Sequence, residues 1–403
     1  MDTSKKVTRT SVEKCIWIGL LCTAVLFALT QLVAQITPAN LGDIPVYQQY
    51  MHLMRQGQIP YHGLNLEYPP GVLPFIVLAT PVGWLFGGSY AAGYIALTFA
   101  AIAAYFGHRY WVGGQRAVLI SAMLFLPLLQ FFFFNLDIFA VLSLYGAVYA
   151  VQQKRYSWSA ALFAISTLIK GYPGVCLLGL FWIIPAAYRR RYLSIFAGIM
   201  VAVLLPVAVL APHGLWYAIT YHTGRPIEYE ATGGAIGFLL HWAGQPLQIF
   251  FSHGSWSVMY TGEKTVGFLS SILLALSLGA ISGLVKLNRL AKQPALISLL
   301  LLTAYMLLFK VGSPQYFIAI LMLAPLASTE LTGASYKQLL AWCLGTGTVI
   351  WLLFITFFTK ARLATTSYAP ILATLATARA VLLTCIAAFL IVALKTPKGV
   401  HKG

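Results

Sequence analysis

Runs of about 18 or more apolar residues recur from one end of this chain to the other, and each is long enough to cross a hydrocarbon core of roughly 30 Å. Hydrophobic residues make up 60% of the chain and charged residues only 9%, whereas soluble proteins carry about 25% charged residues. The sequence therefore excludes a soluble globular protein and predicts an all-α polytopic membrane protein.

Basic residues are spread over short segments between the apolar runs, although the formal net charge of +17 is high. The absence of a single basic patch argues against a nucleic-acid partner. These segments hold Lys5, Lys6, Arg9, Lys14, Arg189, Arg190, Arg191, Lys286, Arg289, Lys292, Lys395, Lys398 and Lys402. By the positive-inside rule, they predict cytoplasmic termini and contact with anionic membrane lipids. The expected location of the protein is a bacterial plasma membrane.

About twelve crossings are predicted in one integral membrane domain, residues 1–403. They are Cys15 to Ile36, Tyr90 to Gly107, Ala117 to Phe134, Ile138 to Gln152, Ser157 to Ile169, Pro173 to Ala187, Leu193 to Ala211, Thr265 to Leu287, Pro294 to Phe309, Gln315 to Ser328, Gln338 to Phe358 and Ala378 to Leu394. The segment Val72 to Phe86 is apolar but broken by prolines and a glycine. A re-entrant helix there keeps the later basic loops on the cytoplasmic side.

Three parts of the domain follow from these crossings. Residues 15–211 form an N-terminal catalytic half with a first outer loop at 37–71. Residues 212–264 form a long outer loop, and residues 265–403 form the C-terminal helices.

The first outer loop holds two of the nine acidic residues of the chain, Asp43 and Glu67. Asp43 precedes an expected interfacial helix at Pro45 to Arg55, so its carboxylate is either a general base on a hydroxyl or the N-cap of that helix. Glu67 precedes the turn Tyr68-Pro-Pro-Gly71. Its carboxylate is either a ligand of a sugar hydroxyl or a solvated loop group.

Three charged residues mark predicted outer ends of later spans. Asp137 begins a span directly after four phenylalanines, where it is either paired and functional or a helix N-cap. Lys170 and Lys310 depart from the positive-inside rule, and each precedes a Gly/Pro turn. The two lysines form either an anion site or snorkelling side chains.

The long outer loop contains Tyr221-His-Thr-Gly-Arg225-Pro-Ile-Glu-Tyr-Glu230. Arg225 either clamps a phosphate through two parallel hydrogen bonds or forms a local salt bridge with Glu228 or Glu230. No phosphate-binding loop, His-Glu-x-x-His zinc helix or Gly-x-Ser-x-Gly elbow is present, and the five cysteines show no metal-ligand spacing.

Several motifs follow one another along most of the chain: Asp43 with Tyr47, Gly57 and Pro60-Tyr61, then Tyr68-Pro-Pro-Gly71, Lys170 before Tyr172-Pro173, Arg225-Pro-Ile-Glu-Tyr-Glu230, and Lys310-Val-Gly-Ser-Pro-Gln-Tyr316. Together they resemble membrane glycosyltransferases of the GT-C type. The similarity is closest to glycosyltransferase family 87, which includes the polyprenol-phosphate-mannose-dependent mannosyltransferases of phosphatidylinositol mannoside synthesis.

The resemblance implies a GT-C fold, a polyprenyl-phosphate sugar donor, inversion at the anomeric carbon, and Asp43 as the catalytic base. Pro45 stands where many such enzymes carry a second carboxylate, so we expect no obligatory metal ion and no cofactor. The expected activity transfers a hexose, mannose above all, to a lipid or glycan acceptor on the outer face. The alternative is a lipid or glycan transporter or flippase without transferase activity.

The expected site residues divide into two further groups. The donor phosphate is expected to bind Arg225, Lys310, Lys170 and His222. Contacts to the sugar or the acceptor are expected from Glu67, Tyr47, Tyr68, Asp137, Glu230, Gln315 and Tyr316.

Overall fold

The structure is a computed structural model that describes residues 9–36, 42–358 and 365–395. Apart from one two-stranded hairpin, the regular elements in these residues are helices. Six helices are long and apolar enough to cross a membrane: Thr10–Val33, Tyr90–Phe134, Ala186–Leu210, Glu263–Lys286, Gly333–Thr356 and Tyr368–Lys395. Six such helices are the pattern of a polytopic integral membrane protein. Among the basic residues used to predict orientation, Lys5, Lys6, Lys398 and Lys402 lie outside the described residues.

The first half of the chain forms a set of packed helices. Its elements are α1 Arg9–Ile36, α2 Ile44–Arg55, η1 Pro70–Val72, α3 Leu73–Trp84, α4 Tyr90–Phe125, η2 Leu126–Leu128, α5 Leu129–Phe134, α6 Asp137–Gln152, α7 Tyr156–Ile169, η3 Tyr172–Cys176, α8 Leu177–Ile183 and α9 Ala186–Leu210.

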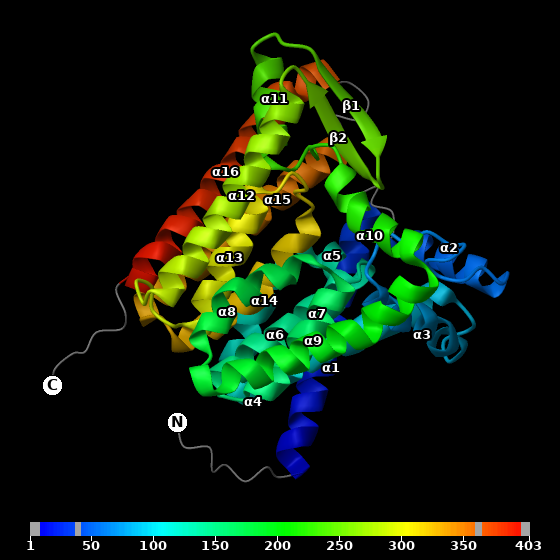
Figure 1. Cartoon of the computed structure of the whole chain (residues 1–403), viewed down its shortest axis with the longest axis vertical. Helices are drawn as coiled ribbons and strands as arrows, with labels where there is room; N and C mark the ends of the chain where they lie inside the picture. The colour runs from blue at the N-terminus through cyan, green and yellow to red at the C-terminus, as the bar shows by residue number, and fades with distance from the viewer. Residues whose placement is uncertain (1–8, 37–41, 359–364, 396–403) are drawn as a thin grey trace.

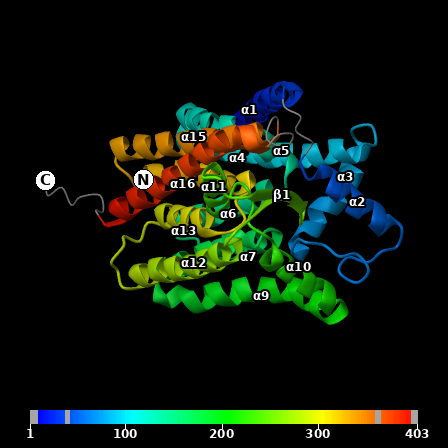
Figure 2. The same cartoon turned by 90° about the horizontal axis from the view of Figure 1, so that it is seen from above.

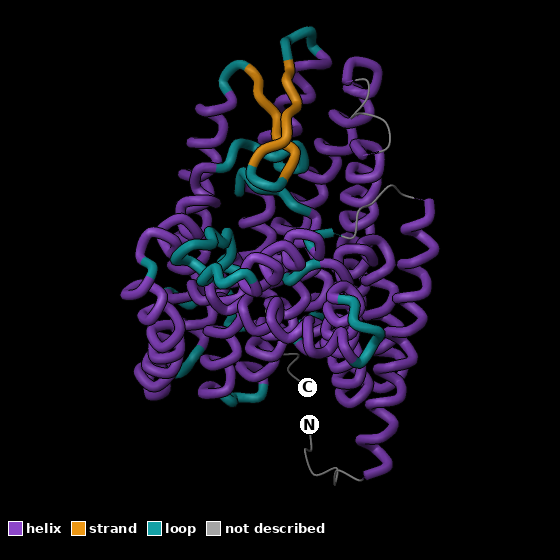
Figure 3. Tube along the Cα trace, turned by 90° about the vertical axis from the view of Figure 1, so that its right-hand side faces the viewer, coloured by secondary structure: helices purple, strands orange, loops and turns teal. Residues whose placement is uncertain are grey.

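The second half adds further helices and the hairpin. Its elements are α10 Pro212–Gly224, α11 Thr232–Trp242, β1 Leu247–Ser252, β2 Ser255–Tyr260, α12 Glu263–Lys286, α13 Pro294–Leu308, η4 Pro314–Tyr316, α14 Phe317–Leu323, η5 Ala324–Thr329, α15 Gly333–Thr356 and α16 Thr365–Lys395. Figure 1 shows the hairpin and α11 at the end of the molecule opposite the start of α1, and Figure 3 shows the same hairpin in orange in the upper part of the molecule, with helices beside it.

The core lies along the short helices. In Figure 2, α6, α7 and α13 lie between α9 and α12 on one side and α1 and α15 on the other. Residues Ala295 to Thr303 of α13 and all seven residues of α14 are buried. The surrounding long helices instead expose many leucines, valines and isoleucines, as expected for surfaces that face lipid.

Two features bear on the expected number of crossings. The helix α3 has 12 residues, which at 1.5 Å each span about 18 Å, too short for a full crossing. The long α4 breaks at Gly114, whose φ of 64° and ψ of −161° are not helical. The apolar stretch Tyr90–Phe134 has 45 residues, about twice what one crossing needs, so this break falls where two crossings would meet. Shorter apolar helices occupy much of the remaining predicted spans, and the total of twelve stays a prediction.

One local expectation was wrong. The triplet Arg189 to Arg191 lies within α9 rather than in a loop, and Arg189 donates hydrogen bonds to the carbonyls of Ile184 and Trp182 at the end of α8. The segment 212–264, expected as a long outer loop, contains α10, α11 and the hairpin. The hairpin turns at His253 and Gly254, both with positive φ, which suits the right-handed twist of two paired strands.

Candidate functional site

The Asp43 carboxylate accepts hydrogen bonds from two tyrosines. Its Oδ2 lies 3.1 Å from the hydroxyl of Tyr47 and 3.4 Å from the hydroxyl of Tyr68. Asp43 also stands at the start of α2, but its side chain makes no capping hydrogen bond to that helix. Asp43 thus occupies the N-cap position of α2, but its carboxylate is held by the two hydroxyls and not by the helix amides.

The two tyrosines keep their protons. Burial raises the pKa of Tyr47 and of Tyr68 well above the usual value, and the neighbouring Asp43 charge raises both further. Each phenol therefore donates to the carboxylate over the whole physiological pH range. The hydroxyl of Tyr47 also accepts from the backbone amide of Leu136, so α2 is tied to the segment that begins α6.

Lys170 lies on the other side of Tyr68. Its Nζ is 4.6 Å from the centre of the Tyr68 ring and 3.2 Å from Oδ2 of Asp137. The Asp137 side chain is fully buried and does not cap α6, whose N-cap is Leu136. Asp137 is thus paired, as one of its two sequence-based interpretations predicts, and Tyr68 lies between a carboxylate and a cation.

Lys170 also lines a cavity of about 470 Å³. The cavity lies among α7, η3, α9, α10 and α13, and Lys170 and His222 are its ionisable lining residues apart from tyrosines. Most of the remaining lining is apolar or aromatic: Pro69, Leu168, Tyr172, Val175, Met200, Leu204, Leu215, Ala218, Ile219, Tyr305, Phe309 and Tyr316. A cation at one place on an apolar wall suits a ligand that joins an anionic group to a hydrocarbon chain.

His222 is neutral near pH 7. Burial, followed by the charges of Lys170 and Arg225, lowers its pKa from 6.5 to about 4. Its Nε2 lies 3.1 Å from the backbone oxygen of Glu67, which can only accept, so Nε2 carries the proton and Nδ1 is an acceptor. His222 therefore fixes the first loop against α10 and adds no positive charge to the cavity.

Arg225 is engaged within its own loop. Its Nη2 lies 2.6 Å from Oε1 of Glu228 and 2.8 Å from Oγ of Ser255, and both partners of the ion pair are buried. The other Glu228 oxygen accepts from the Gly312 amide at 2.8 Å and from the Ser313 hydroxyl at 3.0 Å. The geometry therefore contains the local salt bridge that the sequence left open, and Arg225 Nε has no hydrogen-bond partner among the described residues.

Lys310 donates to the backbone oxygen of Thr223 at 2.5 Å, and its own carbonyl accepts from the Glu228 amide at 3.0 Å. Burial, followed by the charge of Arg225, lowers the pKa of Lys310. Lys310 and Arg225 thus belong to one cluster around Glu228. Lys170 belongs to a second cluster, the Tyr68 cluster, which consists of Asp43, Tyr47, Tyr68, Asp137 and Lys170.

The remaining residues expected to contact the sugar or the acceptor are Gln315, Tyr316, Glu67 and Glu230. Gln315 accepts from the side-chain amide of Asn135 at 3.2 Å, and Tyr316 packs on Tyr172 with ring centres 4.6 Å apart at the cavity wall. Glu67 is half-buried next to Tyr68. Glu230 is buried, and burial together with the nearby Glu228 charge raises its pKa well above the usual value.

Two residues of the site were missed by sequence reasoning. Glu228 was considered only as a partner of Arg225, yet it also holds the Gly312 turn. Arg379 of α16 is fully buried and donates to the carbonyls of Met306 and Gly312, at 3.2 and 3.5 Å. The signal for Arg379 was an arginine inside an apolar helix, a position where a charge is costly and usually functional or paired.

Within residues 9–36, 42–358 and 365–395, no three His, Cys, Asp or Glu residues gather as a metal site would require. Comparison of the chain with protein-family models, with curated proteins and with solved structures found no match in any of the three.

Proposed function

We propose that this protein is an inverting glycosyltransferase of the GT-C type, which moves a hexose from a polyprenyl-phosphate carrier to a lipid or glycan acceptor on the outer face of a bacterial plasma membrane. The observation that carries the proposal is the position of Tyr68, which donates to Asp43 while its ring faces Lys170 at an apolar cavity. The Asp43 carboxylate and the Lys170 ammonium group are thus separated by the Tyr68 side chain.

The cavity supports a lipid-linked donor rather than a soluble one. An isoprenoid chain would lie along the apolar wall formed by residues such as Val175, Leu204 and Ile219, and its phosphate would meet Lys170. The wall includes α9, one of the long apolar helices that face lipid, so a lipid can enter from the bilayer. This chemistry favours Lys170 over Arg225 as the first cation for the phosphate, because Arg225 is committed to Glu228.

The proposed reaction is a single displacement. Asp43 takes the proton of an acceptor hydroxyl, and the hydroxyl oxygen forms a bond to the anomeric carbon. The bond between that carbon and the phosphate oxygen breaks on the opposite side, so a β-linked donor gives an α-linked product. The polyprenyl phosphate leaves as an anion near Lys170 and needs no proton. Hydroxyls of Tyr47 and Tyr68 hold the base in place.

The transporter alternative fits the charge distribution less well. Carriers that alternate between two faces bind substrates near the middle of the bilayer, at broken helices. Here Asp137 and Lys170 lie at helix ends, beside the loop that carries Asp43. About twelve crossings, α3 as a re-entrant helix, α2 at the interface and both termini in the cytoplasm are the topology that this proposal adopts.

The test is a transfer assay with purified full-length protein and radiolabelled polyprenyl-phosphate mannose, with a membrane glycolipid extract as acceptor. We expect Asp43→Asn to lose about 10²- to 10⁴-fold in turnover, because the amide keeps the shape but cannot take the proton. Tyr47→Phe retains the carboxylate and serves as the matched control, with a smaller loss. Equal turnover of wild type and Asp43→Asn would remove Asp43 from its role, and addition of EDTA in the same assay tests the expected independence of metal.

A further inference from the structure

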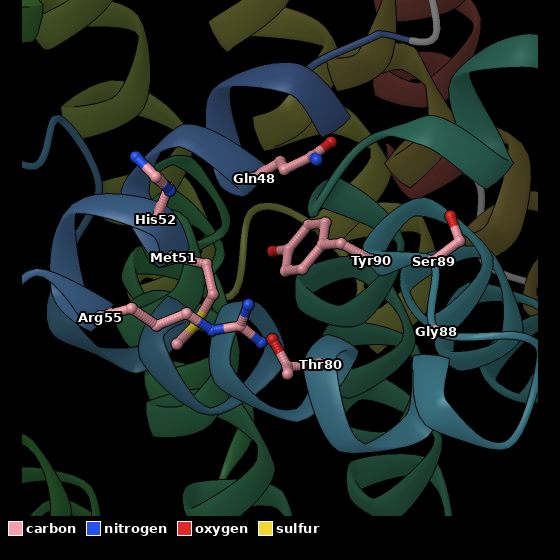
Figure 4. Close-up of a pocket in the computed structure, with 8 residues that line it drawn as sticks. All are labelled: Gln48, Met51, His52, Arg55, Thr80, Gly88, Ser89 and Tyr90. Atoms are coloured by element: carbon pink, nitrogen blue, oxygen red, sulfur yellow. The ribbon is translucent and has the colours of Figure 1, made fainter.

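A second cavity, of about 240 Å³, lies between α2 and the junction of α3 with α4, and none of its lining residues belongs to the Tyr68 cluster. Its lining is Gln48, Met51, His52, Arg55, Thr80, Gly88, Ser89 and Tyr90. Figure 4 shows Arg55 extending from α2 toward Thr80 on α3, with the Tyr90 ring above it and Gln48 on the far side of that ring. Six of these eight residues carry polar side chains, in a chain that is 60% hydrophobic, so the cavity suits a polar ligand.

The cavity has positive charge and no carboxylate. None of its lining residues is acidic, and α2 itself contains no Asp or Glu. The acid at the start of α2, Asp43, is engaged by the hydroxyls of Tyr47 and Tyr68. A guanidinium that reaches across a cavity without a carboxylate in its walls is suited to bind an anion brought by a ligand.

Hydrogen-bond donors lie on more than one wall. Thr80 Oγ1 is buried and has no hydrogen-bond partner among the described residues, although its hydroxyl can donate. Gln48 stands one turn before His52 on the same side of α2, and its amide can also donate. A tetrahedral phosphate presents oxygens in several directions, so it can accept from α2 and α3 at the same time. A planar carboxylate presents only two oxygens.

We propose that this cavity is a phosphate-binding site, in which Arg55, Gln48 and Thr80 hold the phosphodiester of a membrane lipid or a free phosphate ion. The site is distinct from the Lys170 cavity, which shares none of its lining residues.

The position of this site on α2 suggests its use, and this step rests on the proposed function. Arg55 follows Asp43 by twelve residues, so the two lie about 18 Å apart along the helix axis, with Gln48 between them. A phosphate bound at Arg55 would hold a lipid acceptor with its headgroup extended along α2 toward Asp43. The phosphate of the acceptor would thus be recognised on α2, and the phosphate of the donor at Lys170.

The binding test uses full-length protein in detergent and two probes, inorganic phosphate and dihexanoyl phosphatidylglycerol, measured by titration calorimetry. We expect Arg55→Gln to weaken binding by about 10- to 100-fold, as for loss of a charge-assisted hydrogen bond, and Thr80→Val to weaken it less. Arg190→Gln removes the same charge from the exposed face of α9 and should leave binding unchanged. Binding of the lipid alone assigns a headgroup site, and binding of both probes assigns a general phosphate site.

Equal binding by Arg55→Gln and Arg190→Gln, or no binding of either probe to wild type, would overturn the phosphate site. In the transfer assay, Arg55→Gln should raise the KM for a phosphate-bearing acceptor and leave the KM for the donor unchanged. If wild type binds phosphate through Arg55 but transfers no sugar, the proposed function fails while the phosphate site stands.

Discussion

The ion pair between Asp137 and Lys170 offers the sharpest test of the packing around the site. Their charged atoms are 3.2 Å apart, and the exposed fractions of the two side chains are 0% and 9%. Two unit charges at this distance attract each other by about 5 kcal/mol at an effective dielectric constant of about 20. Neither carboxylate oxygen of Asp137 accepts a hydrogen bond among the described residues. The positive charge of Lys170 is therefore the main compensation for the buried Asp137 charge.

Removal of one partner should therefore be costly. We expect Asp137→Asn to lower the free energy of unfolding by about 3 to 5 kcal/mol, because it leaves the Lys170 charge buried without compensation. Lys170→Gln should cost a similar amount for the reciprocal reason. The double variant Asp137→Asn/Lys170→Gln removes both charges, so it should recover most of the loss and show a strongly non-additive cycle.

The assay is reversible unfolding in mixed detergent micelles with increasing dodecyl sulfate, followed by circular dichroism. Transfer activity, measured on the same four proteins, separates stability from chemistry. The double variant should be folded and yet have low turnover, because it lacks the Lys170 cation. Additive single losses, or a loss of less than about 1 kcal/mol for Asp137→Asn, would refute the argument that the pair is a buried, mutually dependent unit.

Two further predictions concern the loops that hold the site. The folded-state pKa of Glu230 is raised above its usual 4.5, so the stability that its neutral form contributes is present below pH 4.5 and is lost as the pH rises through the folded-state pKa. Glu230→Gln should therefore be more stable than wild type at pH 7 to 8.5 and equal to it at pH 4. A stability difference that stays constant across this pH range in dodecyl sulfate titrations would contradict the prediction. A Cβ on Gly214 would overlap the backbone of Tyr61 in the first loop, whereas a Cβ on Gly198 of α9 meets nothing within 4 Å. Gly214→Ala should therefore lower both thermal stability and transfer activity, and Gly198→Ala should leave both near the wild-type values. Equal behaviour of the two variants would show that the loop does not depend on this contact.

The helical membrane class was predictable from sequence because hydropathy is a local property. Each apolar run reports its own burial in lipid or protein, whichever neighbours it has. The break in α4 near Arg116 was predictable for the same reason. Gly114 lies between two apolar stretches, and a glycine readily adopts the positive φ found at this break. The hairpin was missed because His253-Gly254 is a short turn signal within a segment that was interpreted as loop.

The candidate site was predictable only as a list of residues. Asp43, Tyr68 and Lys170 stand out from an apolar background, yet each had a second interpretation as a cap, a turn or a snorkelling side chain. The packing of α2, α6 and α7 decided among these, because it brought Tyr68 between Asp43 and Lys170 and brought Asp137 to Lys170.

Sequence by itself therefore determined which segments are helical and apolar and which polar residues are unusual in such a chain. Tertiary structure alone decided their partners: Arg225 turns to Glu228, Lys170 to Asp137, and Asp43 to two tyrosine hydroxyls. The physical reason is that a buried charge must be compensated by whichever group packing brings within a few ångströms, and that group is often far away along the chain.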